Sequence, residues 1–105
     1  MITVEYSRKG HRVTARGHAG SAPCGHDLIC AAVSAVTYTL AENIRVMQEK
    51  GWLRSHTVKL EPGDAVICAD PAPGHRRQVE AAMDAVCAGY RILAETCPDF
   101  VGYVG

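Results

Sequence analysis

Two long segments of the chain repeat apolar residues every three or four positions, and this period constrains the fold more than any other feature. The segments span residues 27–50 and 75–96. Apolar stripes of this length predict amphipathic helices that each bury one face. Gly51 is a natural stop for the first helix, and Pro98 closes the second because the residue before a proline avoids helical geometry. The stripes are Ile29, Val33, Val36, Leu40, Ile44 and Met47 in the first helix and Val79, Met83, Val86, Tyr90 and Leu93 in the second.

The segments around these helices alternate apolar and polar residues instead. Residues 2–7, 11–16 and 56–61 alternate in this way, which predicts half-buried strands. We expect Val58 and Leu60 to face the core and His11 to be a solvated strand residue. The sequence Pro-Gly-Asp at 62–64 is a strong turn signal, and residues 100–104 predict a last short strand at a sheet edge. The apolar run at 65–69 buries one of two sets, either Val66 and Cys68 or Ala65, Ile67 and Ala69.

These elements predict a single domain over residues 1–105, which is enough chain for one core. The predicted class is α+β: one mainly antiparallel sheet, made of two hairpins plus a short C-terminal strand, with two long helices packed on it in the order ββαββα(β). The order of strands in the sheet does not follow from the pattern. Trp52 and Leu53 come directly after the first helix, where we expect a hydrophobic clasp, with a dimer contact as the alternative.

The charge balance argues against a general affinity for polyanions. Lys plus Arg and Asp plus Glu are both 11, so the formal net charge is zero with neutral histidines. We therefore expect no direct binding of nucleic acid or membrane, for which a basic excess is typical. The cluster at 75–77, His-Arg-Arg, is interpreted as a solvated first helical turn, with a patch for ribosomal RNA or an acidic substrate as the alternative. No secretory signal or membrane-spanning run is visible, so we expect a cytoplasmic protein.

The five cysteines do not form a pattern typical of disulfides or zinc. Their number is odd, no pair has the spacing of a CxxC motif, and no export signal is visible, which makes a disulfide framework a poor fit. The five histidines are dispersed, so a zinc site is not expected either. We interpret Cys87 and Cys97 as core thiols because they continue the apolar stripe of the second helix.

The residues at 17–34 combine a strand end, a loop rich in small residues and the entrance of the first helix. Asp27 is a good N-cap for that helix, which places Cys30 in the first turn. The positive field at a helix N-terminus favours a thiolate, the reactive form of cysteine. His18, held between glycines at the strand end, is a candidate base for Cys30. Ser34 lies one helical turn after Cys30 on the same face.

Other interpretations of this stretch remain open. A cysteine at the start of an apolar helix is usually a small buried hydrophobe. His26 is a second candidate base, and Cys24 lies close enough in sequence to form a redox pair with Cys30. The loop at 19–26 is interpreted as a mobile lid that opens to admit a peptide. Backbone N–H groups at the helix entrance are candidate donors to an oxyanion.

The run Gly-His-Ala-Gly at 17–20, followed by Gly-His-Asp-Leu-Ile-Cys-Ala-Ala-Val-Ser at 25–34, resembles the signature of the ribosomal-processing cysteine protease family, Prp. The resemblance implies that His18 and Cys30 are the catalytic dyad and that Gly17, Asp27 and Ser34 support it. Outside this motif only the layout of the chain is similar. The loop departs from the family pattern at 23–24, where Pro-Cys stands in place of a larger side chain before the motif glycine.

The resemblance also implies an activity and partners. Members of this family remove a short N-terminal extension from a large-subunit ribosomal protein, number twenty-seven in the usual naming, and they are homodimers. The expected mechanism needs no metal or organic cofactor. The expected chemistry is acyl transfer through a thioester on Cys30, with His18 moving the protons. The competing hypotheses are a ribosome-associated binding module that does not cut and a redox sensor that uses Cys24 and Cys30.

Overall fold

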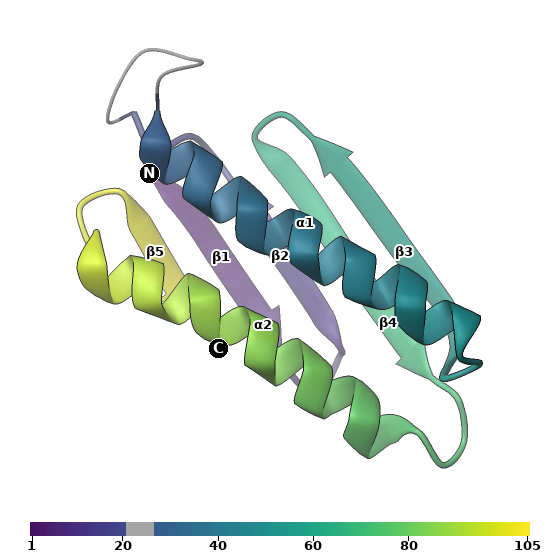
Figure 1. The fold of residues 1–105 in the computed structure, drawn as a ribbon. Coiled ribbons are helices and arrows are strands. Elements are labelled where there is room, and N and C mark those ends of the chain that lie inside the picture. The colour runs from purple at the N-terminus through teal and green to yellow at the C-terminus, as the bar shows by residue number, and fades with distance from the viewer. Residues whose placement is uncertain (21–26) are drawn as a thin grey trace.

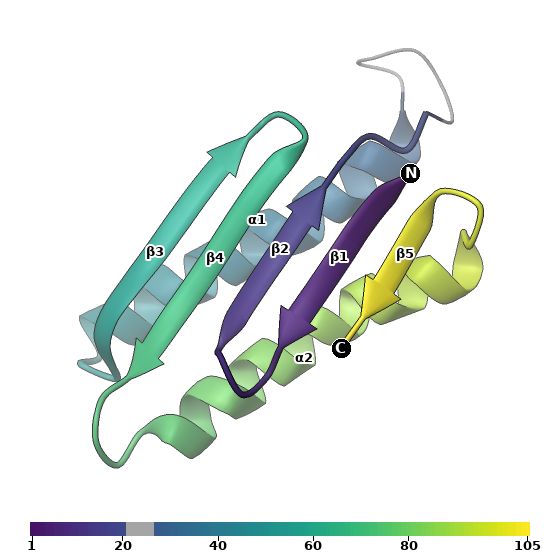
Figure 2. The ribbon, with the colours of Figure 1, turned by 180° about the vertical axis from the view of Figure 1, so that it is seen from behind.

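The computed structural model describes residues 1–20 and 27–105 and shows two layers, a five-stranded sheet with two helices on one of its faces (Figure 1). Viewed from behind, both helices of the described residues lie on the far side of the sheet (Figure 2). The α+β class and the order ββαββαβ are therefore confirmed. The elements are β1 (Ile2–Ser7), β2 (Arg12–Arg16), α1 (Leu28–Glu49), β3 (Leu53–Glu61), β4 (Asp64–Pro71), α2 (Arg76–Thr96) and β5 (Val101–Val104).

The strand order is β3-β4-β2-β1-β5, which the sequence pattern did not determine. The pairs β1·β2, β2·β4 and β3·β4 are antiparallel, whereas the edge strand β5 runs parallel to β1, so the sheet is mixed. Because β4 lies beside β2, the last residue of β2, Arg16, is paired with the first residue of β4, Asp64. The turn between β3 and β4 consequently lies next to the segment that leaves β2, and this places two distant stretches of chain together.

The core lies between the helices and the facing side of the sheet. In β1 the apolar residues Ile2, Val4 and Tyr6 are buried and the residues between them are exposed, as the alternation predicts. Of the two sets open in β4, Ile67 and Ala69 are buried, with Val66 also at low exposure. The buried residues of the helices are Val33, Thr37, Leu40, Ile44 and Met47 in α1 and Val79, Met83, Cys87 and Tyr90 in α2.

Two of the expected core positions are exposed. Val58 and Leu60 pair with Ile67 and Ala65 and so lie on the helix side of the sheet, yet they are 39% and 41% exposed. β3 is the edge strand opposite β5, and its first residue, Leu53, is the one residue of this strand that is buried. Away from Leu53, α1 leaves the edge strand uncovered, and clefts open between the helix and β3. The prediction of the inward face was right, and the prediction of burial was wrong.

His11 is not the solvated strand residue that the sequence suggested. It lies in the β1–β2 turn with a positive φ of 51°. Its side chain is largely buried, and Nε2 is 2.9 Å from Oε2 of Glu80 on α2. Arg8 and Tyr6 bond Asp84 one helical turn further along, so the turn is fastened to α2 by polar contacts. Such long-range partners are invisible in a local pattern.

The predicted clasp after α1 is present. Leu53 is buried in the core, and Trp52 stacks on His75 with ring centroids 5.8 Å apart and planes at 15°. The ammonium of Lys50 lies 4.7 Å from the Trp52 ring centre. Arg76 and Arg77 are exposed, in agreement with a solvated first turn of α2. Cys97, expected in the core, is only partly buried because it is the C-cap of α2.

Candidate active site

Asp27 begins α1 as the sequence predicts. Its backbone is extended, with φ −88° and ψ 101°, and one carboxylate oxygen accepts the N–H groups of Ile29 and Cys30, both at 3.0 Å. The side chain therefore satisfies two of the amide donors that a helix N-terminus leaves without an internal partner. It also occupies two of the N–H groups at the helix entrance, which the sequence analysis considered as oxyanion donors. Its negative charge acts against the positive field of the helix end.

The Cys30 thiol lies in the first turn of α1, partly buried. Its Sγ accepts the backbone N–H of Ala19 at 3.4 Å. Ala19 is itself buried, so this contact joins the segment after β2 to the helix entrance inside the protein. A backbone N–H directed at sulfur stabilises negative charge there, since hydrogen bonds to a charged acceptor are stronger than those to a neutral one.

His18 follows a glycine that the structure requires. Gly17 has a φ of +102°, and a Cβ placed on it would lie 2.3 Å from the carbonyl oxygen of Met1. Its N–H donates to the carbonyl of Gly63 at 3.0 Å. No other residue combines this backbone conformation with this close approach at acceptable cost. The chain therefore leaves β2 along a defined path, and His18 projects over the entrance of α1.

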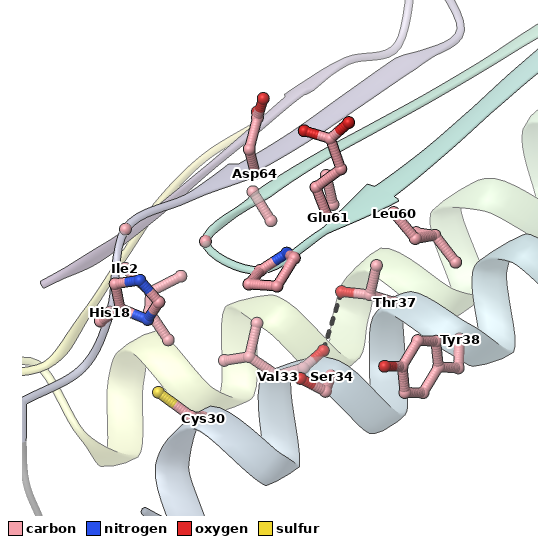
Figure 3. Close-up of a pocket in the computed structure, with 15 residues that line it drawn as sticks. Ile2, His18, Cys30, Val33, Ser34, Thr37, Tyr38, Leu60, Glu61 and Asp64 are labelled. Carbon is pink, nitrogen blue, oxygen red and sulfur yellow. Dashed lines mark hydrogen bonds between the residues drawn. The ribbon is translucent and has the colours of Figure 1, made fainter. Parts of the chain in front are cut away.

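These residues line one cleft of about 360 Å³, within the range of small ligand sites (Figure 3). The cleft brings together Gly17, His18, Cys30 and Ser34, four of the five residues that the sequence singled out, whereas Asp27 caps the helix without lining it. In Figure 3 the sulfur of Cys30 lies on the side of α1 that faces the His18 ring. The remaining lining residues are Ile2, Ala15, Val33, Thr37, Tyr38, Leu60, Glu61, Pro62, Gly63, Asp64 and Ala65.

The sequence analysis missed one wall of this cleft, which the β3–β4 turn supplies. The turn itself was predicted, but its position depends on the strand order. Asp64 fastens it, since its carboxylate accepts hydrogen bonds from Lys59 at 3.1 Å and Arg16 at 3.2 Å. These bonds lower the pKa of the Asp64 carboxyl below its usual value. The opposite wall includes Tyr38, whose side chain is 62% exposed. The sequence pattern does not distinguish Tyr38 from an ordinary surface residue, and only the structure shows that it lines the cleft.

Several sequence predictions lie outside the described residues. Cys24, His26 and the part of the loop at 21–26 belong to this group, so the lid, the second base and the redox pair stay predictions. Among residues 1–20 and 27–105, no group of three His, Cys, Asp or Glu side chains is arranged to hold a metal ion. Over the same residues, no helix is both long enough and apolar enough to cross a membrane.

Comparison with known proteins assigns the chain to a family. The family model described as cysteine protease Prp matches residues 1–101, almost the whole sequence. The chain belongs to the Prp cysteine protease family. The predicted family resemblance is therefore confirmed. A search of curated protein sequences gave no significant match.

Solved structures of similar fold agree with the Prp assignment. One is the essential ribosomal processing protease Prp from S. aureus in complex with a covalently linked product peptide, with a TM-score of 0.74 and 20% identity over 99% of this chain and 100% of that one. The same S. aureus protease in complex with a substrate peptide has a TM-score of 0.69 and 19% identity, over 99% of this chain and 98% of that one. SMU.848 from Streptococcus mutans has a TM-score of 0.70 and 28% identity, over 98% of this chain and 91% of that one. At identities near 20%, the S. aureus matches show the shared fold.

Proposed function

We propose that this Prp family member is a cysteine endopeptidase that removes the short N-terminal extension of large-subunit ribosomal protein number twenty-seven during ribosome maturation. The proposed catalytic dyad is Cys30 and His18, with Gly17, Asp27 and Ser34 in supporting positions. The observation that carries this proposal is the shared cleft, which is lined both by a partly buried thiol at a helix N-terminus and by a histidine that follows a strand end.

The proposed reaction begins with proton transfer. The imidazole of His18 takes the proton of the Cys30 thiol, and the thiolate attacks the scissile carbonyl carbon to form a tetrahedral adduct. Collapse of this adduct breaks the C–N bond, and the imidazolium gives its proton to the leaving amine. A thioester then links the N-terminal fragment to Cys30. Water, deprotonated by His18, attacks the thioester carbonyl, and the acid and the thiol are released.

Ala19 is the backbone group we assign to charge stabilisation at this site. Its N–H points at Sγ, whereas the N–H groups of Ile29 and Cys30 are bonded to Asp27. A fixed backbone donor beside the nucleophile favours the thiolate before attack and costs no rearrangement during the reaction. Ser34 lines the cleft one turn further along α1, and we assign its hydroxyl to a hydrogen bond with the substrate.

The choice of substrate rests on the family. The S. aureus relatives are described as ribosomal processing proteases and were solved with a product peptide or a substrate peptide. The cleft of this chain suits a short extended peptide, because Tyr38 and Leu60 line it with apolar side chains that are exposed to solvent. We further propose a cytoplasmic homodimer, for which exposed apolar residues such as Val104 are suitable contacts.

The direct test is mass spectrometry of ribosomal protein number twenty-seven, carrying its extension, after incubation with the wild-type protein or with variants. We expect a shortened product with wild type and none with Cys30→Ala or His18→Ala. Cys68→Ala is the matched control, because Cys68 lies outside the cleft and contacts Arg12; it should cut at the wild-type rate. If neither wild type nor variants cut but all bind the extension, the protein is a docking module and the proposal is wrong.

A further inference from the structure

The β3–β4 turn contacts the proposed base directly. A Cβ built on Gly63 would lie 2.7 Å from Nε2 of His18, 3.1 Å from Cε1 and 3.5 Å from Cδ2, and these are its three nearest atoms. Atoms of a side chain and a Cβ do not approach to 2.7 Å in folded proteins, so any other residue at position 63 displaces the imidazole. The ring lies against the backbone of the turn and lines the same cleft as Cys30 (Figure 3).

We propose that Gly63 is a positioning residue for His18: the bare backbone of the β3–β4 turn forms the surface on which the imidazole rests, and this contact holds the ring beside Cys30. The inference rests on the proposed dyad and extends it to a residue far away in the sequence. Gly63 contributes no reacting group of its own, and the atoms nearest to its Cβ position all belong to His18, so its effect passes through His18.

Hydrogen bonds hold the turn to the chain segments beside it. The carbonyl of Gly63 accepts the N–H of Gly17, the residue directly before His18, at 3.0 Å. Asp64, directly after Gly63, bonds Arg16 of β2 and Lys59 of β3. The turn and the His18 segment are therefore joined on both sides of the contact, and the position of one determines the position of the other.

A positive φ does not by itself explain the glycine. Gly63 has a φ of +71°, which a side chain disfavours. Gly51 and Gly74 have φ values of +75° and +85°, and a Cβ on either would meet nothing within 4 Å. Alanine at 51 or 74 therefore imposes a similar backbone strain with no contact to His18. These two positions are matched controls, and neither lies in the cleft.

The experiment measures the rate of Cys30 alkylation by iodoacetamide against pH. Trypsin yields the peptide 17–45, which contains both Cys24 and Cys30, so fragmentation of that peptide in the mass spectrometer assigns the label to Cys30. His18→Ala should slow alkylation at neutral pH by at least about tenfold. This is less than the roughly hundredfold or more that a positioned general base contributes to a reaction rate. Gly63→Ala should reproduce most of that loss and shift the pH profile in the same direction. Gly51→Ala and Gly74→Ala should keep the wild-type profile and should lose as much thermal stability as Gly63→Ala.

A double variant separates positioning from general damage. In the His18→Ala background no imidazole remains to be displaced, so adding Gly63→Ala should change the alkylation rate by less than about twofold, the non-additivity expected of residues that act through one contact. Equal slowing by Gly63→Ala in both backgrounds would overturn the inference, as would a single Gly63→Ala variant that reacts like Gly51→Ala.

The ring itself supplies a readout that does not depend on catalysis. The NMR signal of His18 Cε1–H should move in Gly63→Ala and stay in place in Gly51→Ala; an unmoved signal contradicts the contact. If His18→Ala leaves alkylation unchanged, the proposed dyad fails. If His18→Ala slows it but Gly63→Ala does not, only the positioning role fails.

Discussion

A buried hydrogen bond behind the cleft yields an asymmetric prediction. Thr37 of α1 and Tyr90 of α2 are 6% and 0% exposed, and their hydroxyl oxygens are 2.7 Å apart. Thr37 also donates to the carbonyl of Val33 at 2.8 Å, so its hydroxyl has a second partner. Within the described part of the chain, the Tyr90 hydroxyl has no other hydrogen-bond partner. Burial raises the pKa of Tyr90 to about 12 although the bond to Thr37 opposes the shift.

The two single variants should therefore differ. Thr37→Val keeps the shape of the side chain but leaves the Tyr90 hydroxyl buried without a partner, which costs about 1–3 kcal/mol in the free energy of unfolding. Tyr90→Phe removes the hydroxyl, while Thr37 keeps its bond to Val33, and this should cost about 0.5–1.5 kcal/mol. For a domain of this size each kcal/mol lowers the melting temperature by roughly 4 °C.

The double variant decides whether the reasoning is right. With both hydroxyls absent, the Tyr90 penalty in Thr37→Val disappears, so Thr37→Val with Tyr90→Phe should be more stable than Thr37→Val alone. Thermal and urea unfolding followed by circular dichroism measure all three variants, and Cys30 alkylation checks that the cleft is unchanged. A double variant whose loss equals the sum of the two single losses would show that the hydroxyls are not coupled and would refute the account.

The remaining predictions concern the helix cap, a core thiol and an acid-sensitive carboxyl. Asp27→Ala removes two hydrogen bonds at the start of α1 and should lower unfolding stability by about 0.5–2 kcal/mol; thermal unfolding that matches wild type would contradict the cap. Cys87, buried and with its pKa raised by burial to about 12, should resist iodoacetamide at pH 8 in the folded protein, as measured by site-resolved mass spectrometry. Burial would raise the pKa of Asp84, but hydrogen bonds from Tyr6 and Arg8 outweigh it and lower the pKa. This carboxylate therefore stabilises the fold above its unfolded pKa and loses that contribution as pH falls through the folded value, so Asp84→Asn should flatten the acid limb of a stability–pH curve.

Local patterns predicted the elements because their causes are local. The alternation of apolar and polar residues in β1 matches the alternation of buried and exposed side chains. The Asp27 cap follows from the preference of helix N-termini for a short side chain that accepts hydrogen bonds. The burial of Val58 was predicted wrongly because alternation identifies a face but does not show whether a helix covers it. The His11–Glu80 pair was missed because its partners are 69 residues apart.

The candidate site divides in the same way. His18 and Cys30 lie in one short stretch of sequence, and the motif alone was enough to single them out. The wall at Gly63 depends on β4 pairing with β2, and that pairing is a property of the whole sheet. The turn signal at 62–64 does not show where the turn lies in the fold, because that depends on the strand order. The contact of the turn with His18 could therefore be found only in the three-dimensional structure.

The central claim is that Cys30 is the nucleophile, and the most direct measurement is the intact mass of the protein after acid quenching during the first turnover of the precursor ribosomal protein. The account predicts an added mass equal to the N-terminal fragment minus water, held as a thioester and mapped to Cys30 by fragmentation. Hydroxylamine should remove this mass, and Cys30→Ala should neither acquire it nor cut. An acyl group on Cys24, or cleavage by Cys30→Ala at the wild-type rate, would contradict the account.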